Sequence, residues 1–203
     1  MLSMILSMAA FAFVGAVTPG PVNIIATSSG ATYGAVKTSP HVLGATLGYT
    51  LVVLLSGAGV FGLGQQLPAM LNVLHYLGGG FLLYMAYRIA TLAPSASADA
   101  GLTQPPRLLE GALAQLLNPK AWLVATSGVA LFVSSQPEQL LWLLIFSAVS
   151  FCMCLLGVAV WAISGQMLRT LLGNPARQRV FNRTLGALLA GTVILMLADH
   201  WRT

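Results

Sequence analysis

Charged residues are nearly absent from the first part of this chain. Between Met1 and Thr91, Lys37 and Arg88 are the only Asp, Glu, Lys or Arg residues. Over all 203 residues, 57% are hydrophobic and 6% are charged, whereas charged residues make up about 25% of a typical soluble domain. A hydrophobic run of about 20 residues is long enough to cross a bilayer about 30 Å thick. The sequence therefore predicts an all-α integral membrane protein.

Hydrophobic runs separated by polar turns predict six membrane-spanning helices. The expected spans are 2–27, 40–64, 68–92, 108–134, 139–164 and 180–200. A stretch rich in Ala, Ser and Pro then divides the chain into a first three-helix repeat (1–92), a cytoplasmic linker (93–107) and a second three-helix repeat (108–203). Because each repeat has an odd number of spans, we expect the two to insert in opposite orientations, as an inverted repeat.

The basic residues predict which side of the membrane each connection faces. Lys and Arg close to span ends favour the cytoplasmic side. Most basic residues of this chain flank the first, third and fifth connections, and the two other connections carry none: Lys37, Arg88, Arg107, Arg169, Arg177, Arg179 and Arg183. This distribution predicts a multi-pass protein of the cell membrane with both termini outside. It also explains the net charge of +5 without a nucleic-acid partner, and the sequence carries no nucleic-acid motif.

Two helix-breaking clusters interrupt the first and fourth spans. They are Thr18-Pro19-Gly20-Pro21 and Asn118-Pro119-Lys120, and the two spans occupy corresponding places in the expected repeats. Proline removes a backbone donor and clashes with the preceding turn, and such breaks are tolerated in a bilayer where protein or a water-filled cavity meets the freed backbone. Paired interrupted helices of this kind are typical of transporter binding sites.

Each cluster is expected to start a new half-helix inside the membrane. Asn118 is a good N-cap and Pro119 suits the first helical position, while Gly20 permits a bend before Pro21 starts the other half-helix. The two positive helix ends then converge on one zone that suits an anionic group such as a carboxylate. Lys120 lies about 18 Å into its span at 1.5 Å per residue, so we expect its ammonium to face this zone.

These motifs together resemble the lysine-exporter and homoserine/threonine-exporter family (LysE/RhtB). The segments that carry the resemblance are Pro19-Gly20-Pro21, the glycines 30, 34, 44 and 48, Phe81–Arg88, Leu117–Ala121 and Arg183–Leu197. The resemblance implies six spans and the export of an amino acid or its derivative, driven by the proton gradient. The family's usual Pro-Gly-Pro-Asn reads Pro19-Gly20-Pro21-Val22-Asn23 here, which displaces the asparagine by one residue.

The expected substrate-binding residues combine both clusters: Pro19, Gly20, Pro21, Asn23, Asn118, Pro119 and Lys120. Glu110 begins the fourth span, where it either pairs with Arg107 or carries the coupling proton. We expect a transporter rather than an enzyme, with a small amino-acid substrate, the lipid bilayer around it and no cofactor.

Three alternatives remain open at this point. The chain could export another small solute such as a divalent cation, although a metal site would need clustered carboxylate, His or Cys ligands, which the spans lack. A thiol-redox protein would use Cys152 and Cys154, but residues two apart on a helix point to different faces. The small-residue pairs Gly30/Gly34 and Gly44/Gly48 either pack helices within one chain or form the face of a homodimer.

Overall fold

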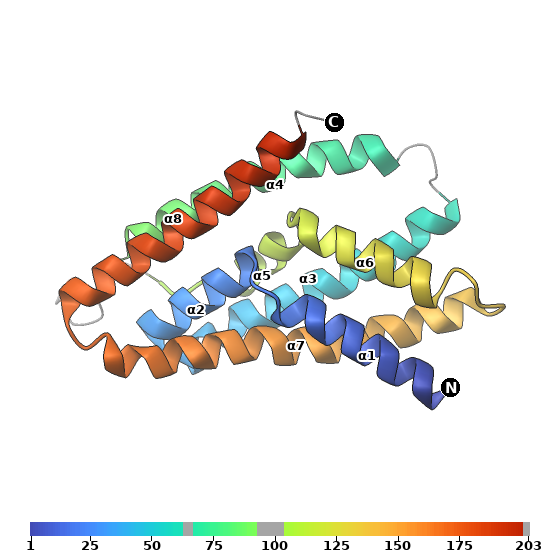
Figure 1. The fold of residues 1–203 in the computed structure, drawn as a ribbon, viewed down its shortest axis with the longest axis horizontal. Helices are drawn as coiled ribbons and strands as arrows, with labels where there is room; N and C mark the ends of the chain where they lie inside the picture. Colours follow the sequence, from blue (N-terminus) through green and yellow to red (C-terminus); the bar gives the residue numbers. More distant parts are fainter. Residues whose placement is uncertain (63–66, 93–103, 201–203) are drawn as a thin grey trace.

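All regular secondary structure in the computed structural model is α-helical over the ranges it describes, which are residues 1–62, 67–92 and 104–200. In chain order the helices are α1 (Leu2–Val17), α2 (Pro21–Tyr33), α3 (Ala35–Gly62), α4 (Leu67–Ala90), α5 (Leu108–Leu116), α6 (Pro119–Phe132), α7 (Gln139–Leu171) and α8 (Pro175–His200). They form an elongated bundle whose long axis the helices roughly follow (Figure 1). The expected linker lies mostly at 93–103, outside the described residues.

Both predicted helix breaks are present. The first separates α1 from α2, which are bent by 63° relative to each other. Pro21 occupies the first turn of α2, where a missing N–H costs nothing because the helix offers it no acceptor. The second break separates α5 from α6, and Asn118 is the N-cap of α6. The sequence therefore predicted the position and the cause of each interruption.

The predicted start of the second span at residue 40 is wrong. Helix α3 begins at Ala35 and contains Pro40 in its interior. Proline cannot donate to the carbonyl four residues earlier, but the Ser39 hydroxyl donates to the Val36 carbonyl at 2.8 Å. The adjacent serine thus replaces the lost backbone bond, and the helix continues through the proline.

The connection between α7 and α8 is shorter than expected. We predicted that the fifth span ends at 164 and the sixth begins at 180, but α7 continues to Leu171 and α8 starts at Pro175. The turn itself lies at Gly173-Asn174-Pro175, as the sequence indicated. Asn174 Oδ1 accepts a hydrogen bond from the Ala176 N–H at 2.8 Å, which caps α8 at its start.

Helices α3 and α7 cross at the centre of the bundle and organise the packing. The broken pair α1 and α2 packs on α7, and the broken pair α5 and α6 packs on α3. Helices α4 and α8 pack against each other along one side (Figure 1). Each broken pair therefore rests on the central helix of the other half of the chain.

Glycines allow these helices to approach closely. A Cβ on Gly44 would lie 1.9 Å from the Leu108 carbonyl oxygen, and one on Gly48 would lie 2.6 Å from that of Ala112. On the other side of the bundle, a Cβ on Gly30 would lie 2.1 Å from the Ala162 carbonyl oxygen. These three glycines therefore serve packing within one chain, and the homodimer remains a prediction.

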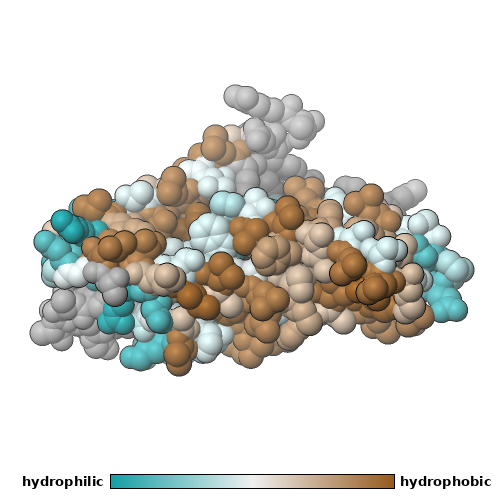
Figure 2. Space-filling view, turned by 60° about the horizontal axis from the view of Figure 1, so that its bottom comes forward, coloured by the Kyte–Doolittle hydropathy of each residue, from teal (hydrophilic) through white to brown (hydrophobic). Residues whose placement is uncertain are grey.

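The surface is that of a membrane protein. Figure 2 shows hydrophobic residues over most of the middle of one face and hydrophilic residues gathered at its two ends. Within the described residues, Ala35–Gly59 and Gln139–Arg169 are long and apolar enough to cross a membrane, and the bent pair Leu2–Val17 and Pro21–Tyr33 makes a third candidate. Six spans in two inverted repeats remain a prediction.

Candidate functional site

The two helix breaks meet in space, although about a hundred residues separate them in the chain. The Lys120 ammonium, in the first turn of α6, donates to the carbonyl oxygen of Thr18 at 2.7 Å and to that of Pro19 at 3.3 Å. Gly20 lies next to the Lys120 ammonium, since a Cβ at Gly20 would be 3.3 Å from Lys120 Nζ. The lysine therefore joins the second break to the first.

Asn23 stabilises the first break from within. Its side-chain amide nitrogen donates to the carbonyl oxygens of Ala16 at 2.8 Å and Thr18 at 2.9 Å. These carbonyls belong to the end of α1, where the helix itself provides no donor. Asn23 thus closes the last turn of α1 from the first turn of α2, and both donors of its amide are used in doing so.

Asn118 has the corresponding position at the second break. Its Oδ1 accepts from the backbone N–H of Lys120 at 3.2 Å, which satisfies one of the first amides of α6. Its amide nitrogen donates to Gln115 Oε1 at 3.3 Å. Trp122 Nε1 donates to the Leu116 carbonyl at 2.7 Å and so satisfies a carbonyl at the end of α5.

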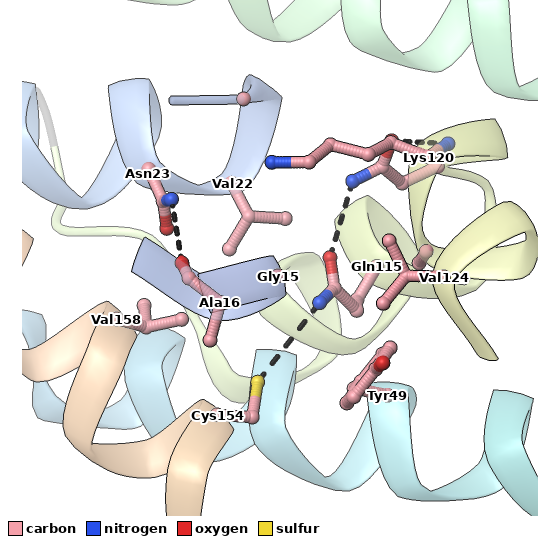
Figure 3. Close-up of a pocket in the computed structure, with 13 residues that line it drawn as sticks. Gly15, Ala16, Val22, Asn23, Tyr49, Gln115, Lys120, Val124, Cys154 and Val158 are labelled. Carbon is pink, nitrogen blue, oxygen red and sulfur yellow. Dashed lines mark hydrogen bonds between the residues drawn. The ribbon is translucent and has the colours of Figure 1, made fainter. Parts of the chain in front are cut away.

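A narrow pocket of about 390 Å³, its open mouth included, lies between the two breaks (Figure 3). Its walls are small or apolar, and its polar atoms lie at the breaks and on the side of α3 and α7. Its lining includes Gly15, Ala16, Gly20, Val22, Asn23, Tyr49, Gln115, Asn118, Lys120, Val124, Cys154 and Val158. We refer to it as the central pocket.

Sequence reasoning missed two polar residues of the central pocket, Gln115 and Tyr49. Gln115 Nε2 donates to Cys154 Sγ at 3.9 Å, which continues a polar chain from Asn118 to α7 (Figure 3). The hydroxyl of Tyr49 is buried and has no partner among the described residues. A signal for Gln115 did exist: it lies three residues before Asn118, a spacing that places both on one helix face.

The charges of the central pocket favour an anion. Lys120 has three N–H donors, and the carbonyls of Thr18 and Pro19 take two of them. The first N–H groups of a helix have no acceptor within it, and Val22 and Asn23, in the first turn of α2, line the pocket. One ammonium donor and the positive end of α2 are thus available to a carboxylate.

Comparison with known proteins identifies the family. The sequence profile described as "LysE type translocator" matches residues 13–199. The chain belongs to the LysE translocator family. A protein named cysteine/O-acetylserine efflux protein, from Escherichia coli O157:H7, is 30% identical over 169 residues, which cover 83% of this chain and 85% of the relative. A protein of the same name from Escherichia coli strain K12 is 29% identical over the same shares. No solved structure gives a significant match.

Membership confirms the predicted resemblance and the class of protein. The chain is a multi-pass membrane transporter of the LysE type and not an enzyme. The family name and the names of these relatives agree with the efflux of amino acids in general.

Glu110 lies apart from the central pocket in this translocator. Its carboxylate forms an ion pair with the Arg88 guanidinium of α4, and its second oxygen accepts from the Arg107 backbone N–H at 3.0 Å. The Arg107 guanidinium instead donates to Gln104 Oε1 at 2.7 Å. The expected pairing with Arg107 therefore involves its backbone, and the charge partner is Arg88.

The two cysteines are separated as their spacing predicted. Cys152 is exposed and Cys154 is buried, and both are free thiols. Within the residues that the structure describes, no group of three or more His, Cys, Asp or Glu side chains is placed to hold a metal ion.

Proposed function

We propose that this translocator exports a small amino acid or amino-acid derivative from the cytoplasm, with the carboxylate of the substrate bound in the central pocket. The observation that carries the proposal is the position of the Lys120 ammonium, which lies at the contact of the two breaks. In the proposed complex the remaining donor of Lys120 and the free amides at the start of α2 bind the carboxylate.

The walls of the pocket favour a short polar side chain on the substrate. Gly15, Ala16 and Val158 give the pocket a small or apolar lining on one side, while the amides of Gln115 and Asn118 offer hydrogen bonds on another. The relatives from Escherichia coli are named for the efflux of cysteine and O-acetylserine. Both molecules combine an α-carboxylate with a short side chain, so we propose them as the first substrates to test.

The packing of the helices supports an alternating-access mechanism with six spans in two inverted repeats. Each broken helix pair packs on the central helix of the opposite half, and α4 packs on α8. The two halves therefore make equivalent contacts with each other, as expected of an inverted repeat. In this mechanism the halves rock around a fixed site near the midplane. We propose that the end bearing Lys37 and Arg169 faces the cytoplasm, with both termini outside and export coupled to the proton gradient.

The two alternatives receive less support from the site. A divalent-cation exporter would need a ligand cluster, and the described residues contain none of three or more candidate ligands. A thiol-redox activity would need Cys152 and Cys154 to meet, and one of them is exposed while the other is buried.

Efflux from proteoliposomes tests the proposed function. We expect purified translocator to release O-acetylserine and cysteine faster than lysine, since the pocket has no acidic residue in its lining to receive a second positive charge. The Lys120→Ala variant should insert normally and lose this release. Wild-type protein that releases none of a panel of amino acids would overturn the proposal.

A further inference from the structure

A second pocket, which we call the inner pocket, lies along α2 beyond the central pocket. It is a narrow space of about 280 Å³, its open mouth included, formed by α2, α4 and the segment that precedes α5. Its lining consists of Ile25, Ser28, Ser29, Tyr33, Met85, Arg88, Ile89, Leu92, Gln104 and Pro106. Ser28 follows Asn23 of the central pocket by five residues, or about 7.5 Å along the helix at 1.5 Å per residue. Helix α2 is therefore a wall of both pockets.

This inner pocket contains hydroxyl groups that nothing in the described protein satisfies. Ser28 is fully buried, and neither its hydroxyl nor that of Tyr33 has a hydrogen-bond partner among the described residues. The neighbouring Thr27 hydroxyl shows the usual alternative, because it donates to the Asn23 carbonyl of its own helix at 2.8 Å. Buried polar groups in proteins are nearly always paired, so the Ser28 and Tyr33 hydroxyls can each bind a polar group in this pocket.

Arg88 adds a positive charge to the same pocket. Its guanidinium has five donors, of which one contacts Glu110 and another reaches the Gln104 carbonyl only at 3.5 Å. Its side chain is 27% exposed, so the same arginine lines the pocket and reaches solvent. Arginine is the side chain best suited to a planar carboxylate.

We infer that this pocket is an inner binding site for the amino acid that the translocator exports, occupied before the central pocket on the cytoplasmic side. Arg88 binds the α-carboxylate of the amino acid, and the hydroxyls of Ser28 and Tyr33 hydrogen-bond to its polar atoms. This inference rests on the proposed function for the identity of the ligand. The position of the pocket, near the end of the molecule that bears the basic connections, places it between the cytoplasm and the central pocket.

Uptake of radiolabelled O-acetylserine into inside-out membrane vesicles tests the inner site, because the cytoplasmic face then meets the added substrate. The double variant Ser28→Ala/Tyr33→Phe removes two hydroxyls and leaves Lys120 untouched. We expect KM to rise about two- to tenfold for each hydrogen bond removed, with the maximal rate unchanged. The matched control is Ser3→Ala/Tyr87→Phe, which makes the same chemical changes at exposed positions of α1 and α4. An unchanged KM, or a lower maximal rate at unchanged KM, would overturn the inference.

A labelling experiment reports on the site without requiring transport. Ser28→Cys is introduced into a Cys152→Ser/Cys154→Ser/Lys120→Ala protein and treated with a membrane-permeant thiol reagent. We expect O-acetylserine to slow the labelling of the new thiol, since the inner site does not depend on Lys120. Labelling that is unaffected by O-acetylserine counts against the inner site.

The two proposals fail in different ways. Loss of efflux in Lys120→Ala, together with an unchanged KM in Ser28→Ala/Tyr33→Phe, would retain the proposed function and reject the inner site. Protection of the thiol by O-acetylserine in a protein whose wild-type form shows no efflux would retain the inner site and reject the export function.

Discussion

Asn23 shows how one side chain can hold a helix break in place. Its amide nitrogen donates to the carbonyls of Ala16 and Thr18, and Thr18 is also the residue that Lys120 contacts. The orientation of the first break, and hence the position of the Lys120 ammonium, depends on a donor at this position.

We therefore predict that Asn23→Asp is as damaging as Asn23→Ala. Aspartate keeps the shape and the acceptor oxygen but has no donor when ionised, and each carbonyl left without a donor costs about 1–3 kcal/mol when buried. The midpoint of thermal unfolding in detergent and the rate of efflux should both fall in each variant. Normal efflux and stability in Asn23→Asp, with loss in Asn23→Ala, would show that the oxygen matters instead.

The residues at the breaks were predictable from sequence, and those opposite them were not. Asn118 and Lys120 belong to a local motif, in which the N-cap and the first turn follow each other along the chain. Tyr49 and Cys154 reach the central pocket from α3 and α7, so their role depends on how distant helices pack. Lys120 was expected to face the zone between the two helix ends, but its two contacts with the first break could not be foreseen because they join residues far apart in sequence.

At the scale of helices, glycines allow the backbone of each broken pair to pack closely against its central helix. A Cβ on Gly44 would lie 1.9 Å from the Leu108 carbonyl oxygen, whereas one on Gly191 would meet nothing within 4 Å. The first position can accept a methyl group only if α3 and α5 separate.

We predict that Gly44→Ala lowers the midpoint of thermal unfolding and that Gly191→Ala does not. Overpacking of this kind costs about 1–3 kcal/mol, while alanine at an open helical position is favoured over glycine. Efflux should fall in Gly44→Ala because α5 leads directly into the second break. Equal midpoints for the two variants would contradict the packing described here.

Helix boundaries were the least predictable feature at this scale. Proline normally marks the start of a helix, so Pro40 was expected to begin the second span, but the Ser39 hydroxyl compensates for the missing donor. A side-chain substitute of this kind leaves no periodic signal in the sequence. The breaks were predictable because each combines proline with a residue that starts or permits a new helix, Asn118 in one case and Gly20 in the other.

Across the whole molecule, the Arg88–Glu110 ion pair connects the two halves of the chain. Arg88 lies in the last turn of α4 in the first half, and Glu110 lies in the first turn of α5 in the second half. If the halves rock against each other during transport, this contact contributes to the closed arrangement at that end.

We predict that Arg88→Glu and Glu110→Arg each reduce efflux, because each places two like charges together. The double variant should recover part of the efflux, since the pair is restored with its charges exchanged. Recovery is expected to be incomplete because Glu110 also caps α5 through the Arg107 N–H and Arg88 lines the inner site. Absence of any recovery, with the double variant folded and inserted, would argue against a role for the pair.

The most direct test of the carboxylate site is a comparison of two competitors in wild type and Lys120→Met. O-acetylserine and its carboxamide differ only where the charged carboxylate is replaced by a neutral amide. In wild type we expect the carboxamide to displace bound radiolabelled O-acetylserine about tenfold less well or worse, because a hydrogen bond to a charged group contributes about 1.5–3 kcal/mol. In Lys120→Met, which should no longer transport, the same binding competition should show a difference between the two competitors that is at least about threefold smaller. Full discrimination retained in Lys120→Met would contradict the site described here.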